Sequence, residues 1–338
     1  MEMKLCFMGF GSVGRELVKL IDRKCDEVKA RYDLSLKIVG IATGRHGILI
    51  DRSGIDHSFA LDGEWADRAW PGTEENRIEM IHECGADTLI EMSPINRDTG
   101  RPALDYLETA LKLNMHAITA NKGPVVHGYH HLHDLARQHG KAFLFEATVM
   151  DGFPLLNLYR ECLPATRVLS FRGVLNSTTN LILTLMEEGQ SFDEAVKYAQ
   201  QIGIAETDPS NDVDGWDSSV KVCVLSNVLM GAGIRPTDVD RTGIRGVTSQ
   251  MIKEAQLGRR KWRLMCSAEW MDGKLIAKVA PEEVAANDPM FRLYGTTSAI
   301  QIRTDSLNQL TLLETAPTPA QTAFGVLADL ISAARGRF

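Results

Sequence analysis

The chain has 338 residues, of which 44% are hydrophobic and 24% charged, a composition typical of a globular protein with a sizeable buried core. Its net charge of −7 and the lack of any Lys/Arg run longer than three residues argue against nucleic acid as a partner, and no apolar stretch is long enough to span a membrane. The six cysteines lack a C-x-x-C pair, which predicts reduced thiols. We expect a cytoplasmic protein without a signal peptide, because a strand begins almost at the first residue.

The first half of the chain alternates between strand and helix patterns. Short apolar runs bounded by polar or glycine residues predict strands, and apolar residues at helical spacing predict helices between them. The predicted strands are 4–9, 36–42, 88–92, 116–119 and 141–146, and the predicted helices are 13–22, 103–113 and 129–139. This order predicts an α/β fold with a Rossmann-type parallel sheet covered by helices on both faces.

Beyond residue 154 the pattern changes to a mixture of helices and alternating strands, which suits an α+β substrate domain. The predicted strands are 168–175, 274–279, 299–304 and 309–313, and the predicted helices are 178–188, 192–202, 217–230 and 322–334. We therefore divide the chain into a dinucleotide-binding domain, 1–152, and a substrate-binding and dimerisation domain, 153–319. The last helix, within 320–338, is expected to pack back on the first domain.

A glycine-rich motif follows the first predicted strand and opens the first predicted helix. It fits G-x-G-x-x-G and consists of Gly9, Phe10, Gly11, Ser12, Val13 and Gly14. The glycines permit a tight turn, close approach of the backbone to a pyrophosphate and helix–strand packing, while the helix N-terminus attracts phosphate. We interpret the motif as a dinucleotide-binding loop; the alternative is a structural glycine turn.

The end of the second strand bears on which dinucleotide binds. NAD sites place an acid there for the ribose 2′-hydroxyl. This strand instead runs into Thr43-Gly44-Arg45-His46, where Arg45 could meet a 2′-phosphate. The sequence favours NADP over NAD, unless Arg45 is only a solvated loop residue.

Five acids and a lysine, within 206–221, precede the strongly apolar run 222–230. Lys221 stands four residues after Asp217, so on a helix the two side chains share a face and each stabilises the charge of the other. Such a group suits a site that binds a cationic small molecule and moves one proton. An ordinary surface salt bridge is the alternative.

The glycine motif, the turn Ala120-Asn121-Lys122-Gly123-Pro124 and the acidic block 206–221 occur together and in this order. In this the chain resembles the homoserine dehydrogenases, in the short form that lacks a regulatory domain. The resemblance implies interconversion of L-homoserine and L-aspartate 4-semialdehyde with NADP or NAD in amino-acid biosynthesis. It also implies a homodimer formed through the sheet of the central domain.

The resemblance also implies roles for the charged residues. Glu206 and Asp217 would bind the substrate, with a carboxylate facing its ammonium group. Lys221 would exchange a proton with the substrate oxygen, as general acid–base catalysis requires during hydride transfer. Asp212 would orient Lys221, and Lys122, on a loop beside the cofactor, would help to orient the substrate or complete the proton transfer.

Four uncharged residues also acquire roles from the resemblance. Ser177 and Thr178 would hold the carboxylate end of the substrate; an N-cap of the following helix is an equally good interpretation. Ser93 and Pro94 would line the nicotinamide side of the cofactor pocket, although a plain turn after the strand would look the same.

Two features concern metals. Glu146 and Val149 match positions at which the family holds Na⁺ or K⁺ through backbone and side-chain oxygens. The cluster of His127, His130, His131 and His133 lacks a metalloprotease motif and is interpreted as part of a surface helix.

The chain departs from the family pattern in two segments. The usual glycine run is replaced by Met150-Asp151-Gly152-Phe153, and the usual glycine loop near the C-terminus by 314–321, which contains Pro317 and Pro319. Proline cannot take the positive φ that glycine allows. Asp151 therefore joins the candidate substrate-binding residues, because its carboxylate could recognise an extra amine or hydroxyl.

The departures leave two alternatives to the homoserine reaction. An enzyme with the same fold and lysines could act on another alcohol or aldehyde, or use a transient hydride step in a lyase reaction. A non-catalytic dinucleotide-binding protein is the alternative from another class. Lys122, Glu206, Asp217 and Lys221 argue against it, since loss of function would erode them first.

Overall fold

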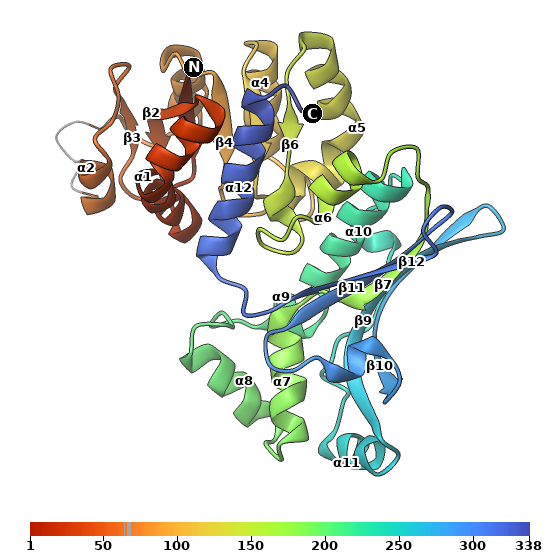
Figure 1. The fold of residues 1–338 in the computed structure, drawn as a ribbon. Coiled ribbons are helices and arrows are strands. Elements are labelled where there is room, and N and C mark those ends of the chain that lie inside the picture. The colour runs from red at the N-terminus through yellow and green to blue at the C-terminus, as the bar shows by residue number, and fades with distance from the viewer. Residues whose placement is uncertain (64, 66–68) are drawn as a thin grey trace. The chain divides into compact units, whose positions relative to one another are not determined.

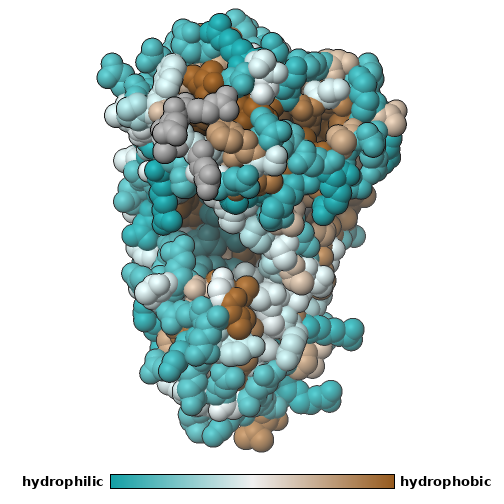
Figure 2. Space-filling view, turned by 90° about the vertical axis from the view of Figure 1, so that its left-hand side faces the viewer, coloured by the Kyte–Doolittle hydropathy of each residue, from teal (hydrophilic) through white to brown (hydrophobic). Residues whose placement is uncertain are grey.

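The computed structural model describes residues 1–63, 65 and 69–338, and the chain divides into two compact units (Figure 1). Unit 1 comprises Met1–Cys162 and Thr318–Phe338, and unit 2 comprises Leu163–Pro317. Within the described residues, no helix is both long and apolar enough to cross a membrane. In the face shown in Figure 2, hydrophilic residues cover most of the surface and hydrophobic ones are scattered between them.

Unit 1 is built on a six-stranded sheet with the order β3-β2-β1-β4-β5-β6. All neighbours are parallel except β3, which runs antiparallel to β2. The strands are β1 (Glu2–Met8), β2 (Ser35–Ala42), β3 (Ile48–Ile50), β4 (Thr88–Glu91), β5 (His116–Thr119) and β6 (Phe143–Leu144). The chain leaves β1 toward one side and returns at β4 on the other, so the carboxyl ends of β1 and β4 flank the switch point, where ligands bind in such sheets.

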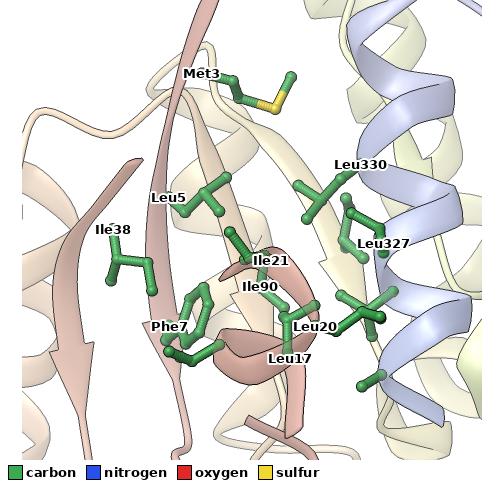
Figure 3. Close-up of a cluster of buried hydrophobic side chains, with 14 of the residues drawn as sticks. Met3, Leu5, Phe7, Leu17, Leu20, Ile21, Ile38, Ile90, Leu327 and Leu330 are labelled. Carbon is green, nitrogen blue, oxygen red and sulfur yellow. The ribbon is translucent and has the colours of Figure 1, made fainter. Parts of the chain in front are cut away.

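The helices of unit 1 connect these strands, and the last one comes from the C-terminal end of the chain. They are α1 (Ser12–Tyr32), α2 (His57–Asp62), α3 (Glu74–Glu83), α4 (Ala103–Lys112), α5 (Lys122–His139), α6 (Leu155–Asn157) and α12 (Pro319–Ala334), with the short helical turns η1 (Glu146–Thr148) and η2 (Leu158–Cys162). Helix α12 packs against α1, β5 and η1. Figure 3 shows Leu5 and Phe7 of β1, Leu17 of α1 and Leu330 of α12 in one buried apolar layer.

Unit 2 contains a second six-stranded sheet with the order β12-β11-β7-β9-β10-β8. The strands are β7 (Val168–Val174), β8 (Asp240–Arg241), β9 (Arg260–Met271), β10 (Lys274–Ala285), β11 (Ser298–Thr304) and β12 (Gln309–Glu314). The helices are α7 (Ser177–Glu187), α8 (Phe192–Gln201), α9 (Ser210–Val213), α10 (Trp216–Met230) and α11 (Ser249–Leu257), with the turns η3 (Pro236–Asp238) and η4 (Pro289–Arg292). Helices α7, α10 and α11 pack against β9.

The α/β fold and most of the predicted elements are confirmed, but two predictions are wrong and some elements, β9 among them, were not predicted. The strand predicted at 141–146 is only Phe143–Leu144, because η1 takes up the residues after it. Lys122 does not stand on a loop: Asn121 caps α5 by accepting a hydrogen bond from the Gly123 backbone N–H at 2.9 Å, so Lys122 is the first helical residue. The long hairpin partner β9 was not predicted, since its alternation is interrupted by charged and aromatic residues.

Candidate functional site

The glycine loop joins β1 to α1 at the switch point of the unit 1 sheet. Gly9 has φ 97°, and a Cβ there would lie 2.6 Å from the carbonyl carbon of Met92, so only glycine fits. Gly11 is the N-cap of α1 and has open space at its Cβ position. A Cβ on Gly14 would meet the Phe10 ring at 3.1 Å, because the helix packs closely on the loop. These are the three roles that a pyrophosphate-binding glycine motif requires.

The other loop residues lie as a phosphate-binding turn needs. Ser12 is exposed at the first position of α1, Val13 is partly buried, and the Phe10 ring packs 5.7 Å from the Trp65 ring. The helix therefore presents its N-terminal N–H groups next to a turn in which Gly9 and Gly11 carry no side chain. An anion, such as a dinucleotide phosphate, fits this arrangement.

The turn after β2 contains Thr43 and Arg45. Thr43 is buried and fixes the turn: its hydroxyl accepts the His46 backbone N–H at 2.7 Å, and its own N–H bonds the Gly47 carbonyl at 2.9 Å. Arg45 is exposed on this turn. The guanidinium is thus presented to solvent by a rigid turn that carries no acid.

A buried carboxylate that the sequence analysis missed lies at the carboxyl end of β4. Glu91 accepts hydrogen bonds from the Ser93 backbone N–H at 2.7 Å, from the Ser93 hydroxyl and from the Thr119 hydroxyl at 2.9 Å. Asn121 donates in turn to the Ser93 carbonyl at 3.2 Å. Burial raises the pKa of Glu91 to about 7, although the bonds from Ser93, Thr119 and Asn121 oppose this. Glu91 thereby ties together the loops that follow β4 and β5.

This network holds the residues predicted to lie near the nicotinamide. Ser93 is partly buried and hydrogen-bonded to Glu91, and the next residue, Pro94, is exposed. Lys122 is partly buried at the first position of α5, directly after the capping residue Asn121. Ser93 and Asn121 are therefore brought together, with Pro94 and Lys122 next to them in the chain.

Glu146 of η1 and Asp329 of α12 form a buried pair. The Glu146 carboxylate accepts hydrogen bonds from the Leu156 and Asn157 backbone N–H groups at 2.8 and 2.5 Å. The backbone N–H of Glu146 donates to the Asp329 carboxylate at 2.8 Å. Burial raises the pKa of each carboxyl to about 7. Among the described residues, no three His, Cys, Asp or Glu side chains are grouped to hold a metal ion. The predicted cation site at Glu146 and Val149 stays a prediction.

The two segments that depart from the family pattern contact each other within unit 1. Asp151, with φ 44°, accepts a hydrogen bond from the Thr322 hydroxyl at 2.8 Å. A Cβ on Gly152 would overlap the carbonyl oxygen of Gln321, so the backbones touch. The Asp151 carboxylate thus has a partner on α12, and its predicted contact with substrate stays a prediction.

In unit 2, Lys221 and Asp217 lie one turn apart at the start of the buried helix α10. The Lys221 ammonium donates to the Leu175 carbonyl at 2.7 Å and lies 3.3 Å from the Asp217 Oδ2 atom. The two side chains are only 15% and 14% exposed, so this is no solvated surface pair. The Leu175 carbonyl and the Asp217 carboxylate both stabilise the charged amine. The i,i+4 spacing predicts the contact with Asp217 but not the one with Leu175.

A second carboxylate joins this pair through Asn176. The Asn176 side-chain amide donates to Asp212 at 2.7 Å and to Asp217 at 3.0 Å. Burial, and then the charge of Asp217, raise the pKa of Asp212, while the bond from Asn176 lowers it. The structure therefore brings Asp212, Asp217 and Lys221 into one hydrogen-bonded group.

The remaining residues predicted to bind the substrate differ in their burial: Thr178 and Ser177 are buried or partly buried, and Glu206 is exposed. Thr178 is buried, and its hydroxyl donates to the Ile204 carbonyl at 3.3 Å; Ser177 is partly buried at the first position of α7. The N-cap of that helix is Asn176, not Ser177 or Thr178. Glu206 is exposed, and its backbone carbonyl accepts a hydrogen bond from the Gln200 side chain at 3.1 Å. In the part of the chain that the structure describes, its carboxylate is not joined to the group of Asp212, Asp217 and Lys221.

Sequence reasoning left three buried polar residues, Glu91, Asn176 and Asp329, out of the candidate sites. A weak signal exists for two of them, since Glu91 ends an apolar strand and Asp329 interrupts the apolar face of a helix. An acid in such a position is buried only with partners. Asn176 begins the turn whose Ser177 and Thr178 were assigned to the substrate, but it was given no role of its own, because asparagine is common before helices.

A dinucleotide-type sheet with a phosphate-binding turn at its switch point, joined to a second unit that buries a lysine–carboxylate group, defines an NAD(P)-dependent oxidoreductase. Family models agree: residues 154–331 match homoserine dehydrogenase, and residues 9–146 match the homoserine dehydrogenase NAD-binding domain. The chain belongs to the homoserine dehydrogenase family, whose members are NAD(P)-dependent oxidoreductases acting on a CH–OH group.

Similar proteins cover nearly the whole chain. A homoserine dehydrogenase of Methanocaldococcus jannaschii is 35% identical over 97% of this chain and 98% of its own length. An NAD⁺-dependent homoserine dehydrogenase of Pseudomonas canavaninivorans is 34% identical over 98% and 96%. The crystal structure of homoserine dehydrogenase from Thermoplasma acidophilum has a TM-score of 0.83 at 26% identity, and that of a hyperthermophilic archaeal homoserine dehydrogenase mutant with NADPH has 0.82 at 28%. Both cover 98% of either chain.

Glu91 should make the stability of unit 1 depend on pH. Because its folded pKa is raised from 4.5 to about 7, unfolding releases a proton between these values, and the free energy of unfolding falls as pH rises through this window. The loss is on the order of 3 kcal/mol, from about 1.4 kcal/mol per pH unit. Glu91→Gln should flatten this fall in urea titrations from pH 4.5 to 7.

The exposed Glu79→Gln on α3 is the matched control and should leave the slope unchanged. The Glu146–Asp329 pair is unchanged in both variants, so its contribution to the pH dependence of the free energy of unfolding remains. A Glu91→Gln protein with the wild-type slope would show that Glu91 is ionised throughout the window.

Proposed function

We propose that the protein interconverts L-homoserine and L-aspartate 4-semialdehyde with NAD(P). The observation that carries the proposal is the buried Lys221–Asp217 pair, because it supplies a proton carrier and a carboxylate one helical turn apart. The sequence relatives and solved structures named homoserine dehydrogenase support the choice of substrate.

Lys221 acts as the proton carrier. Its two observed partners, the Leu175 carbonyl and the Asp217 carboxylate, stabilise the ammonium form. That form gives a proton to the carbonyl oxygen when an aldehyde is reduced, and the neutral amine takes a proton from the hydroxyl in the reverse direction. The nicotinamide, when bound, supplies or accepts the hydride.

The carboxylates recognise the amino-acid end of the substrate. Asp217 and Glu206 face its ammonium group, and Asp212 keeps Lys221 oriented through the shared network. The start of α7, with Ser177 and Thr178, binds its carboxylate, since helix N-termini attract anions. Lys122, at the start of α5, assists in orienting the substrate or completing the proton transfer.

The cofactor phosphates bind the glycine loop of unit 1, at Gly9, Gly11 and Gly14. Ser93 and Pro94, fixed by Glu91, line the nicotinamide side. One relative is named as NAD⁺-dependent, and a mutant of another was solved in complex with NADPH, which supports the use of NAD(P) here. Arg45 favours NADP here, because a guanidinium pairs strongly with a 2′-phosphate.

Na⁺ or K⁺ binds at Glu146 and Val149 in this proposal. The Glu146 carboxylate is already bonded to two backbone N–H groups, so we assign the cation to carbonyl oxygens of this segment. Backbone carbonyl oxygens can replace the hydration shell of K⁺, as they do in channel selectivity filters.

Lys221→Met should lower kcat for NAD(P)⁺ reduction by L-homoserine by about 10² to 10⁴, the range of general acid–base catalysis. Reduction would be followed by absorbance with each dinucleotide, in K⁺, in Na⁺ and without either. Lys253→Met, an exposed lysine of α11, is the control. A loss below tenfold would refute the role of Lys221, and an inactive wild type that still binds cofactor would refute the substrate.

Arg45→Ala should raise the KM for NADP⁺ by about tenfold, the equivalent of one lost charged contact of about 1.4 kcal/mol, with little change for NAD⁺. Initial rates with both dinucleotides would measure the ratio. Arg23→Ala, an exposed arginine of α1, should change neither. Equal losses for both dinucleotides would contradict a 2′-phosphate contact.

We propose further that the protein is a homodimer through the open face of the unit 2 sheet. This face carries a central polar row, in which Arg172 bonds Gln301 at 3.3 Å and Asp288 at 2.8 Å. The exposed apolar side chains of Met271, Ile276 and Leu313 lie on its strands. An uncovered sheet face with satisfied charges and apolar side chains suits a self-complementary interface.

Ile276→Glu should convert the dimer into monomers, because it would bury two like charges across a two-fold interface. Sedimentation velocity at micromolar concentration would measure the mass. Leu257→Glu on α11, where the leucine is 87% exposed, should leave the dimer intact. A dimer that survives Ile276→Glu would place the interface elsewhere.

A further inference from the structure

We propose that Asn176 is a positioning residue for proton transfer: its single side-chain amide holds the Asp212 and Asp217 carboxylates side by side next to Lys221. This inference rests on the proposed function, since it assigns Asn176 a part in the same reaction. Asn176 need not touch the substrate, and it acts through the two acids.

Every hydrogen-bonding position of the Asn176 side chain is used. Its Nδ2 group donates to Asp212 Oδ1 at 2.7 Å and to Asp217 Oδ2 at 3.0 Å, and its Oδ1 atom accepts from the Thr179 backbone N–H at 2.8 Å and hydroxyl at 2.9 Å. The residue is only 4% exposed. An amide has two donor hydrogens and two acceptor lone pairs, so its rotamer and its O/N orientation are fixed by these four bonds.

The contacts converge on the lysine. The Asp217 Oδ2 atom that accepts from Asn176 also lies 3.3 Å from the Lys221 nitrogen. The carbonyl of Leu175, the residue before Asn176, accepts from Lys221 at 2.7 Å. Two consecutive residues thus hold the lysine and its carboxylate, and a shift of this turn would move both.

The chemistry of the group explains why an amide is needed. Asp212 comes from α9 and Asp217 from α10, and two buried carboxylates this close repel each other. The charge of Asp217 raises the pKa of Asp212, and the bond from Asn176 lowers it. One donor hydrogen for each acid stabilises both carboxylates against their mutual repulsion, which a hydroxyl or a carboxylate at position 176 cannot do.

Among the described residues, few other groups face this cluster. The Thr178 hydroxyl of α7 does not titrate, but it lies beside Asp212 and lowers its pKa. From β9, the Cys266 thiol faces Asp217 and Lys221, and burial raises its pKa to about 11, so it stays neutral near pH 7. A change in pH dependence on altering Asn176 therefore reports on the two acids and Lys221.

Asn176→Asp isolates the donor role. Aspartate keeps the acceptor that caps α7, so the helix start is preserved, but it loses both donor hydrogens and adds a third negative charge. We expect kcat with L-homoserine at pH 7 to fall at least about tenfold. We also expect the acidic limb of the kcat/KM profile to move to higher pH, because Asp212 holds its proton more tightly.

Asn227→Asp is the matched control. Asn227 lies in α10, the helix of Asp217 and Lys221, and is 2% exposed. Its side chain also makes paired bonds: it donates to the Ile234 carbonyl at 3.0 Å and accepts the Ile234 N–H at 2.7 Å. Its substitution loses the donor and keeps the acceptor in the same way. It should lower the thermal midpoint without moving the acidic limb.

The outcomes separate the inference from the proposed function. A wild type that does not turn over homoserine would end the proposed function alone. The inference is then tested by carboxyl-carbon NMR of Asp212, assigned with Asp212→Asn, in wild type and Asn176→Asp without substrate. A titration of Asp212 displaced to higher pH supports it. An unchanged titration or acidic limb, or an equal displacement in Asn227→Asp, would overturn it.

Discussion

The buried ion pair of Lys221 and Asp217 imposes the strongest constraint on unit 2. A charge removed from water is costly unless partners replace the lost hydration, so each end of the pair needs hydrogen-bonding groups from other elements. The Leu175 carbonyl at the end of β7 serves the lysine, and the Asn176 amide serves the carboxylate. The turn from β7 to α7 is therefore fixed against the first turn of α10, and the Lys221 amine acquires a defined position.

The same requirement organises unit 1 around a different group. Glu91 is buried at the end of β4, and the donors that satisfy it come from the loops after β4 and β5. On the other side of the switch point, Gly9 leaves no room for a side chain against Met92. One strand end is thus shaped by a buried acid and the other by a missing Cβ. Together they leave a turn that a dinucleotide can approach.

The two segments that differ from the family pattern share one structural explanation. Asp151 bonds Thr322, and the backbone at Gly152 touches that at Gln321, so a change in one segment requires an accommodating change in the other. The contact places both segments in the packing at the start of α12.

The sequence by itself determined the α/β class, the position of the cofactor loop and the pairing of Asp217 with Lys221. These depend on short-range periodicity and spacing, which local patterns record. The tertiary structure alone decided that Asn176 joins Asp212 to Asp217, that Glu91 fixes Ser93, and that Glu206 lies outside the network. These contacts join residues as much as 41 positions apart in the sequence. An asparagine or a buried acid therefore acquires its hydrogen-bond partners only in the folded tertiary structure.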